Sequence, residues 1–136
     1  MECIKYIPGD LVSVYAGVKK YSVKVIGTEV ENEVFSYQIK FPNGEIQYAD
    51  KDNIVPIPLT PEILDNNKWK RLKSKRYTWW RIRLDSVYYF IKPNRDYPSI
   101  WEFCRGNTRR CFKKIRYVHQ LQHFLFGLDL NSDMNL

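Results

Sequence analysis

The chain has 136 residues, of which 44% are hydrophobic and 27% charged, so it fits one ordinary domain or two very small ones and is not a disordered protein. Its 22 Lys and Arg residues exceed its 15 Asp and Glu residues, and the resulting charge of +7 indicates anionic partners. No run of about 18 apolar residues could span a membrane, and the N-terminus lacks the apolar segment of a signal peptide. The odd, scattered set Cys3, Cys104 and Cys111 favours thiols in a reducing cytoplasm over a disulfide framework or a zinc ribbon.

Short alternating strands dominate residues 1–57. Alternation of apolar and polar residues predicts half-buried strands, and Asn43-Gly44 between two such runs predicts a type I′ hairpin turn. The predicted strands are 11–15, 21–28, 34–41, 45–49 and 53–56.

Two short segments at the ends of this region resemble segments of a known fold. The turn "GDLV" at its start and "DNIVPI" at its end resemble those of SH3-like, Tudor-type barrels. The resemblance covers residues 8–57 and implies a small antiparallel barrel, but no activity, because many functions share that fold.

A connector is predicted over residues 58–67. Thr60 is a suitable N-cap and Pro61 a suitable first helical residue, so a helix of about two turns is expected here. We place the boundary between two modules at this connector.

The second module, residues 68–136, is predicted as a basic antiparallel sheet with one C-terminal helix. Its expected strands are 77–84, 87–92, 100–105 and 109–115, with turns at Asp85-Ser86 and Gly106-Asn107. Apolar residues then recur at helical spacing over 117–127, where Gly127 is the expected C-terminal cap, and the polar tail 131–136 is expected to fray. The predicted fold class is therefore mainly β (α+β), with the helix packed across a four-stranded sheet.

Two segments together are similar to one group of proteins. The connector "PIPLTPEIL" and the late helix "YVHQLQ" resemble those of uncharacterised small proteins from phages and mobile elements of gut Bacteroides-type bacteria. The match covers residues 56–69 and 117–128, and differs at Gln120, where the group tends to have Glu. The resemblance implies a phage or prophage product in a bacterial cytoplasm or virion, and it implies no chemistry.

His119 and His123 lie four residues apart on the predicted helix. A zinc protease of this spacing needs an intervening Glu as general base, but Gln120 stands there and cannot accept a proton. The chain has only two His residues, so a third ligand would have to be an acid or a cysteine. We therefore interpret both histidines as flanking the apolar side of a packed helix, and expect no metal and no cofactor.

Nucleophilic catalysis has little support. Cys104 or Cys111 could approach His119 only through the fold, and structural burial is the commoner state of cysteine. The six glycines are isolated, so no phosphate-binding loop is predicted. We expect no enzyme, and a metal-dependent hydrolase using the two histidines is the weakest alternative.

The basic charge is concentrated between Lys68 and Arg116. This 49-residue stretch contains sixteen Lys and Arg residues and three acids. In residues 77–84, alternation places Thr78, Trp80, Ile82 and Leu84 on one face and Tyr77, Trp79, Arg81 and Arg83 on the other. The predicted binding residues are Lys70, Arg71, Lys73, Lys75, Arg76, Tyr77, Trp79, Arg81, Arg83, Arg109, Arg110 and Lys113.

Two partner classes fit this basic aromatic stretch. Lys and Arg neutralise phosphates and aromatic rings stack on bases, which favours nucleic acid. Trp, Tyr and Arg are also the residues that dominate protein interfaces, so a phage or host protein is the alternative partner. The sequence leaves the oligomeric state open.

Overall fold

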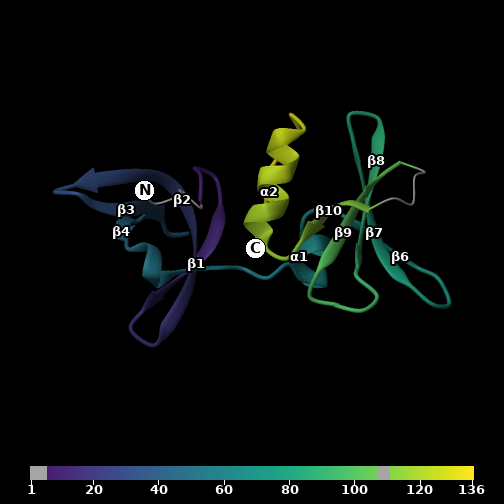
Figure 1. The fold of residues 1–136 in the computed structure, drawn as a ribbon, viewed down its shortest axis with the longest axis horizontal. Coiled ribbons are helices and arrows are strands. Elements are labelled where there is room, and N and C mark those ends of the chain that lie inside the picture. Colours follow the sequence, from purple (N-terminus) through teal and green to yellow (C-terminus); the bar gives the residue numbers. More distant parts are fainter. Residues whose placement is uncertain (1–5, 107–110) are drawn as a thin grey trace. The chain divides into compact units, whose positions relative to one another are not determined.

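The computed structural model describes residues 6–106 and 111–136, with only the backbone described for Cys111 and Phe112. The chain divides after Ile57 into two compact units, each built around one five-stranded antiparallel sheet (Figure 1). The predicted fold class, mainly β with one C-terminal helix, is confirmed. Neither of the two α-helices in the described residues is long and apolar enough to cross a membrane.

The first unit contains β1 (Leu11–Ala16), β2 (Lys19–Glu31), β3 (Val34–Lys40), β4 (Ile46–Ala49) and β5 (Ile54–Pro56). The sheet order is β4-β3-β2-β1-β5, and a 3-10 turn precedes β5, an arrangement that fits the predicted small barrel. The long β2 carries a bulge between Val25 and Gly27, which increases its twist. Alternate residues of the strands form one buried cluster together with Tyr6, which precedes β1. The strand residues of this cluster are Val12, Val14, Val23, Val25, Tyr37, Ile39, Ala49 and Ile54.

The hairpin at Asn43-Gly44 is tight, but its predicted type was wrong. Gly44 donates a backbone hydrogen bond to Phe41, and Gly44 has a φ of 92° while Asn43 is not in the left-handed region. This hydrogen bond makes Pro42 and Asn43 the central residues of the turn. The proline ring fixes φ of Pro42 near −65°, whereas a type I′ turn needs positive φ at both central residues. The chain instead places two successive positive φ values, 50° and 64°, at Asn32-Glu33 between β2 and β3.

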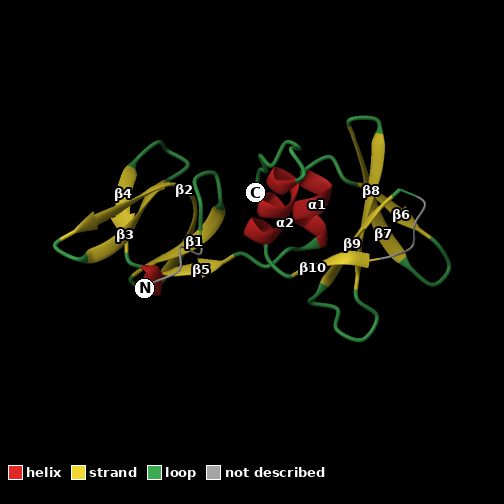
Figure 2. Cartoon of the chain, turned by 45° about the horizontal axis from the view of Figure 1, so that its top comes forward, coloured by secondary structure: helices red, strands yellow, loops and turns green. Residues whose placement is uncertain are grey.

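The strands of the second unit form a meander that follows one helix and precedes another along the chain (Figure 2). Its elements are α1 (Pro61–Asn66), β6 (Lys70–Lys73), β7 (Thr78–Leu84), β8 (Val87–Pro93), β9 (Trp101–Arg105), β10 (Cys111–Ile115) and α2 (Val118–Gly127). The sheet order β10-β9-β8-β7-β6 follows the chain, so each strand pairs with its neighbour in sequence. The predicted sheet of four strands lacked β6, whose sequence KRLK has too few apolar residues to show alternation.

The segment before β6 is packed into the second unit. Thr60 caps α1 by accepting a hydrogen bond from the Ile63 N–H at 3.3 Å, with Pro61 in the first turn, as predicted. Leu59 and Leu64 are buried, and the Leu59 carbonyl accepts a hydrogen bond from the Trp101 indole at 2.9 Å. These contacts make residues 58–67 part of the fold of this unit.

The C-terminal tail is also held in place, which corrects the expectation that it frays. Asn67 and Asn135 exchange two hydrogen bonds, of 2.6 and 2.7 Å, and Met134 is buried. Helix α2 runs through Gly127, and the residue with positive φ after it is Asp129, at 58°. Gly127 is therefore the last helical residue and not the left-handed cap that was predicted.

Candidate nucleic-acid interface

The pairing registers of the second sheet assign its side chains to two faces. Arg81 lies opposite Lys70 on one side and Phe90 on the other, and Arg83 lies opposite Tyr88. Because side chains alternate along a strand, these partners mark one face, which we call the outer face. Its members are Lys70, Leu72, Trp79, Arg81, Arg83, Tyr88, Phe90, Lys92, Glu102, Cys104 and Lys114.

The opposite, inner face is the core of the second unit. Trp80, Ile91 and Phe103 lie on it and are buried. Helix α2 packs there, since the Phe103 ring lies 4.8 Å from the Phe124 ring in an edge-on contact. Helix α1 is joined to the same face, because the Trp80 indole donates a 2.9 Å hydrogen bond to Asp65. Both helices therefore pack on the inner face.

Two arginines of the outer face lie over one tyrosine. The guanidinium carbon of Arg81 is 4.7 Å from the centre of the Tyr88 ring, and that of Arg83 is 5.8 Å away. Guanidinium groups stack on aromatic faces, so the ring orients two flexible cations side by side. Tyr88 itself is 41% exposed. The result is a preorganised pair of positive charges on the open surface.

The outer face also carries half-buried aromatic rings beside those charges. Trp79 and Phe90 are each partly exposed, whereas Trp69, Trp80 and Trp101 are buried. Such rings keep a surface on which a planar group can stack. Trp79 is thus the tryptophan of the chain that the fold leaves at the surface.

The charge of the outer face is mainly positive. Lys70, Arg81, Arg83, Lys92 and Lys114 supply five cations, and Glu102 supplies one acid. Lys92 lies 3.7 Å from Glu102, which partly neutralises it. Neighbouring positive groups that are not balanced by acids produce a field that attracts anions.

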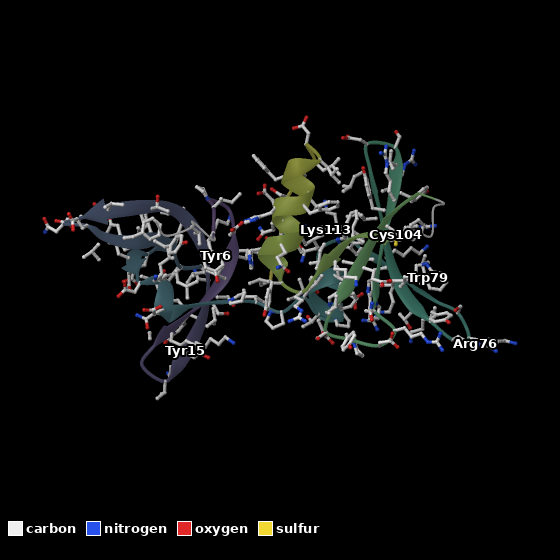
Figure 3. All side chains as sticks on the ribbon, viewed as in Figure 1. Tyr6, Tyr15, Arg76, Trp79, Cys104 and Lys113 are labelled. Carbon is white, nitrogen blue, oxygen red and sulfur yellow. The ribbon has the colours of Figure 1, made fainter. Side chains whose placement is uncertain are left out.

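The structure brings together four of the residues predicted to bind: Lys70, Trp79, Arg81 and Arg83 lie on the outer face. The hairpin between β6 and β7 presents three more as exposed residues, namely Lys75, Arg76 and Tyr77. Arg76 lies at the tip of this hairpin (Figure 3). A basic rim therefore adjoins the sheet at the β6–β7 end.

Arg71 and Lys73 lie on the other side of β6, opposite Trp80 and Thr78. Arg71 forms an ion pair with Asp65 and lies over the Trp80 ring at 5.3 Å. The hydrogen bond from Trp80, together with the one from Arg71, holds the pKa of the Asp65 carboxyl below its usual value. Arg71 thus fastens α1 to the sheet and does not share the outer face.

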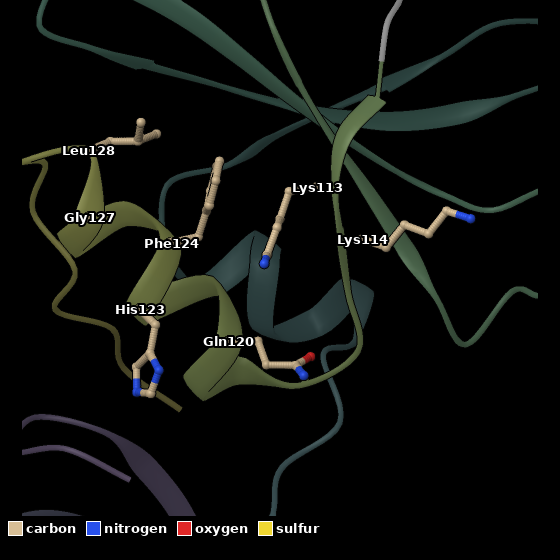
Figure 4. A pocket seen from close by; sticks show the side chains of 7 residues that line it. All are labelled: Lys113, Lys114, Gln120, His123, Phe124, Gly127 and Leu128. Atoms are coloured by element: carbon tan, nitrogen blue, oxygen red, sulfur yellow. The ribbon is translucent and has the colours of Figure 1, made fainter. Parts of the chain in front are cut away.

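Lys113 also lies away from the outer face, since it pairs with Phe103 of the inner face. Figure 4 shows its side chain directed toward α2, whereas Lys114 points away from that helix. The remaining two predicted binding residues, Arg109 and Arg110, lie outside the described residues.

The sequence interpretation missed the contribution of β8 to this face. Tyr88, Phe90 and Lys92 of β8 were not among the predicted residues. The β8 residues could have been found, because Asp85-Ser86 forms the two-residue turn that was predicted, with φ values of 48° and 64°. A two-residue turn pairs Leu84 with Val87 and so fixes the register of all following pairs.

The two histidines lie on α2. His119 is buried and stacks on Tyr117, and the His119 and His123 rings are 5.5 Å apart. In the part of the chain that the structure describes, no group of three His, Cys, Asp or Glu residues is placed to hold a metal ion. His123 lines a shallow depression of about 400 Å³ together with Lys113, Lys114, Gln120, Phe124, Gly127 and Leu128 (Figure 4).

A scan against family models and searches of curated proteins and of solved structures return no match to this chain.

Proposed function

We propose that this protein is a non-catalytic nucleic-acid-binding protein whose binding surface is the outer face of the second unit. One observation carries the proposal: the strand registers gather Trp79, Phe90 and Tyr88 with Arg81 and Arg83 on the face opposite both helices. Positive groups that neutralise phosphates and rings that stack on bases are the two components of such surfaces.

The local charge favours nucleic acid over a protein partner. Protein interfaces are enriched in Arg but depleted of Lys, whereas the outer face carries Lys70, Lys92 and Lys114 beside its arginines. The aromatic residues and arginines fit either partner. The cations that surround them fit a polyanion better.

The salt dependence of binding tests this function. If Lys70, Arg81, Arg83 and Lys114 each neutralise one phosphate of a single strand, log Kd plotted against log salt concentration has a slope of about 3. Fluorescence anisotropy with a labelled oligonucleotide of mixed sequence, between 50 and 200 mM NaCl, measures that slope. Absence of binding at 50 mM NaCl, or a slope well below 1, would count against the proposal.

A further inference from the structure

The outer face also specifies which form of nucleic acid it takes. We infer that it binds single strands and not duplexes, with unpaired bases stacked on Trp79 and Phe90 while Arg81 and Arg83 hold phosphates. This inference rests on the proposed function and adds the ligand class.

The width of the sheet argues against insertion into a duplex. Five strands at about 4.8 Å spacing span about 19 Å, whereas the major groove of B-DNA is about 12 Å wide and admits a helix or a two-stranded ribbon. The outer face can therefore meet a duplex only at its phosphates. Its half-buried rings would then contact nothing in the duplex.

The spacing of the two residues that carry these rings fits bases that are not stacked on each other. Phe90 lies opposite Arg81, so Trp79, two residues before Arg81, is its diagonal neighbour. Diagonal neighbours in an antiparallel pair are about 7–8 Å apart, about twice the 3.4 Å rise per nucleotide of a duplex strand. Two such rings receive two bases only when the bases are separated, as in a single strand.

The spacing of the two arginines suits phosphates of the same single strand. Arg81 and Arg83 are two residues apart on β7, which is about 6.8 Å along an antiparallel strand. Tyr88 orients both guanidinium groups. Rings and cations thus alternate over neighbouring strands, so that one extended strand can present its bases to the rings and its phosphates to the arginines.

Variants that remove a ring but keep an apolar side chain test this inference. Trp79→Leu and Phe90→Leu should each weaken binding of a single-stranded 12-mer by about 5- to 150-fold. The slope against salt should not change, because no phosphate contact is lost. Binding to a hairpin duplex should be weak in the native protein and unchanged in both variants. Tyr97→Leu, which removes a 65% exposed ring from the loop before β9, is the matched control.

Failure of this inference can be told apart from failure of the proposed function. Steeply salt-dependent binding that is equal for duplex and single strand, and equal in native protein and both leucine variants, would overturn the single-strand inference alone. Absence of any salt-dependent binding would overturn both. The fluorescence of the buried tryptophans shows whether each variant is folded.

Discussion

Replacing Phe103 by alanine is expected to lower the free energy of unfolding of the second unit by about 3–5 kcal/mol. The Phe103 side chain is fully buried, and its ring contacts those of Phe124, Tyr89 and Trp69 at 4.8, 5.5 and 6.1 Å. The variant leaves a cavity where the sheet meets α2. Since domains of this size have only about 5–15 kcal/mol of stability, this loss is a large share of it.

Urea unfolding followed by tryptophan fluorescence measures this loss. The method reports the second unit alone, because the first 57 residues contain no tryptophan. Phe126→Ala is the matched control: Phe126 lies on α2 but is 66% exposed, so the change should stay within about 0.5 kcal/mol. Equal effects of the two substitutions would contradict the assignment of Phe103 to the core.

The double variant Arg81→Ala/Arg83→Ala is expected to have the largest effect on binding. Each lost charge-assisted contact should weaken oligonucleotide binding by about tenfold or more at low salt. Loss of two phosphate contacts should also flatten the slope of log Kd against log salt by about 1.4 units for a single strand. Anisotropy titrations at several NaCl concentrations give both quantities.

The matched control removes two charges from the other unit. Lys19→Ala/Lys24→Ala changes two exposed lysines of β2 and lowers the net charge by the same amount. If binding depends only on total charge, the two double variants will weaken it equally, and the outer face has no special role. A loss of affinity confined to the Arg81→Ala/Arg83→Ala variant supports direct contact between the outer face and the oligonucleotide.

Much of the fold could be predicted because local rules and tertiary packing agree in most of the strands. Alternation predicts that Tyr37 and Ile39 share one face of the strand over residues 34–41, and both are buried in β3. The errors occurred where one residue changes the local geometry, as Pro42 does in its turn. The burial of Met134 could not be predicted, because it depends on packing within the second unit rather than on the composition of the tail.

The candidate site could be predicted only along one strand. Alternation within β7 correctly grouped Trp79 with Arg81 and Arg83. Side chains from the flanking strands join this face through pairing registers, which a pattern along a single strand does not contain. For that reason the predicted set included Arg71, which lies on the opposite side of β6, and omitted Phe90.

The tryptophan indoles provide the most direct measurement of the central claim, that the outer face of the second unit is the binding surface. In a two-dimensional ¹H–¹⁵N spectrum each indole N–H gives its own signal, and the four tryptophans report different surroundings. Trp79 lies on the outer face, whereas Trp69, Trp80 and Trp101 are buried. We predict that titration with a single-stranded oligonucleotide shifts the Trp79 signal while the other three stay nearly constant. A saturable interaction that leaves Trp79 unchanged would contradict the account.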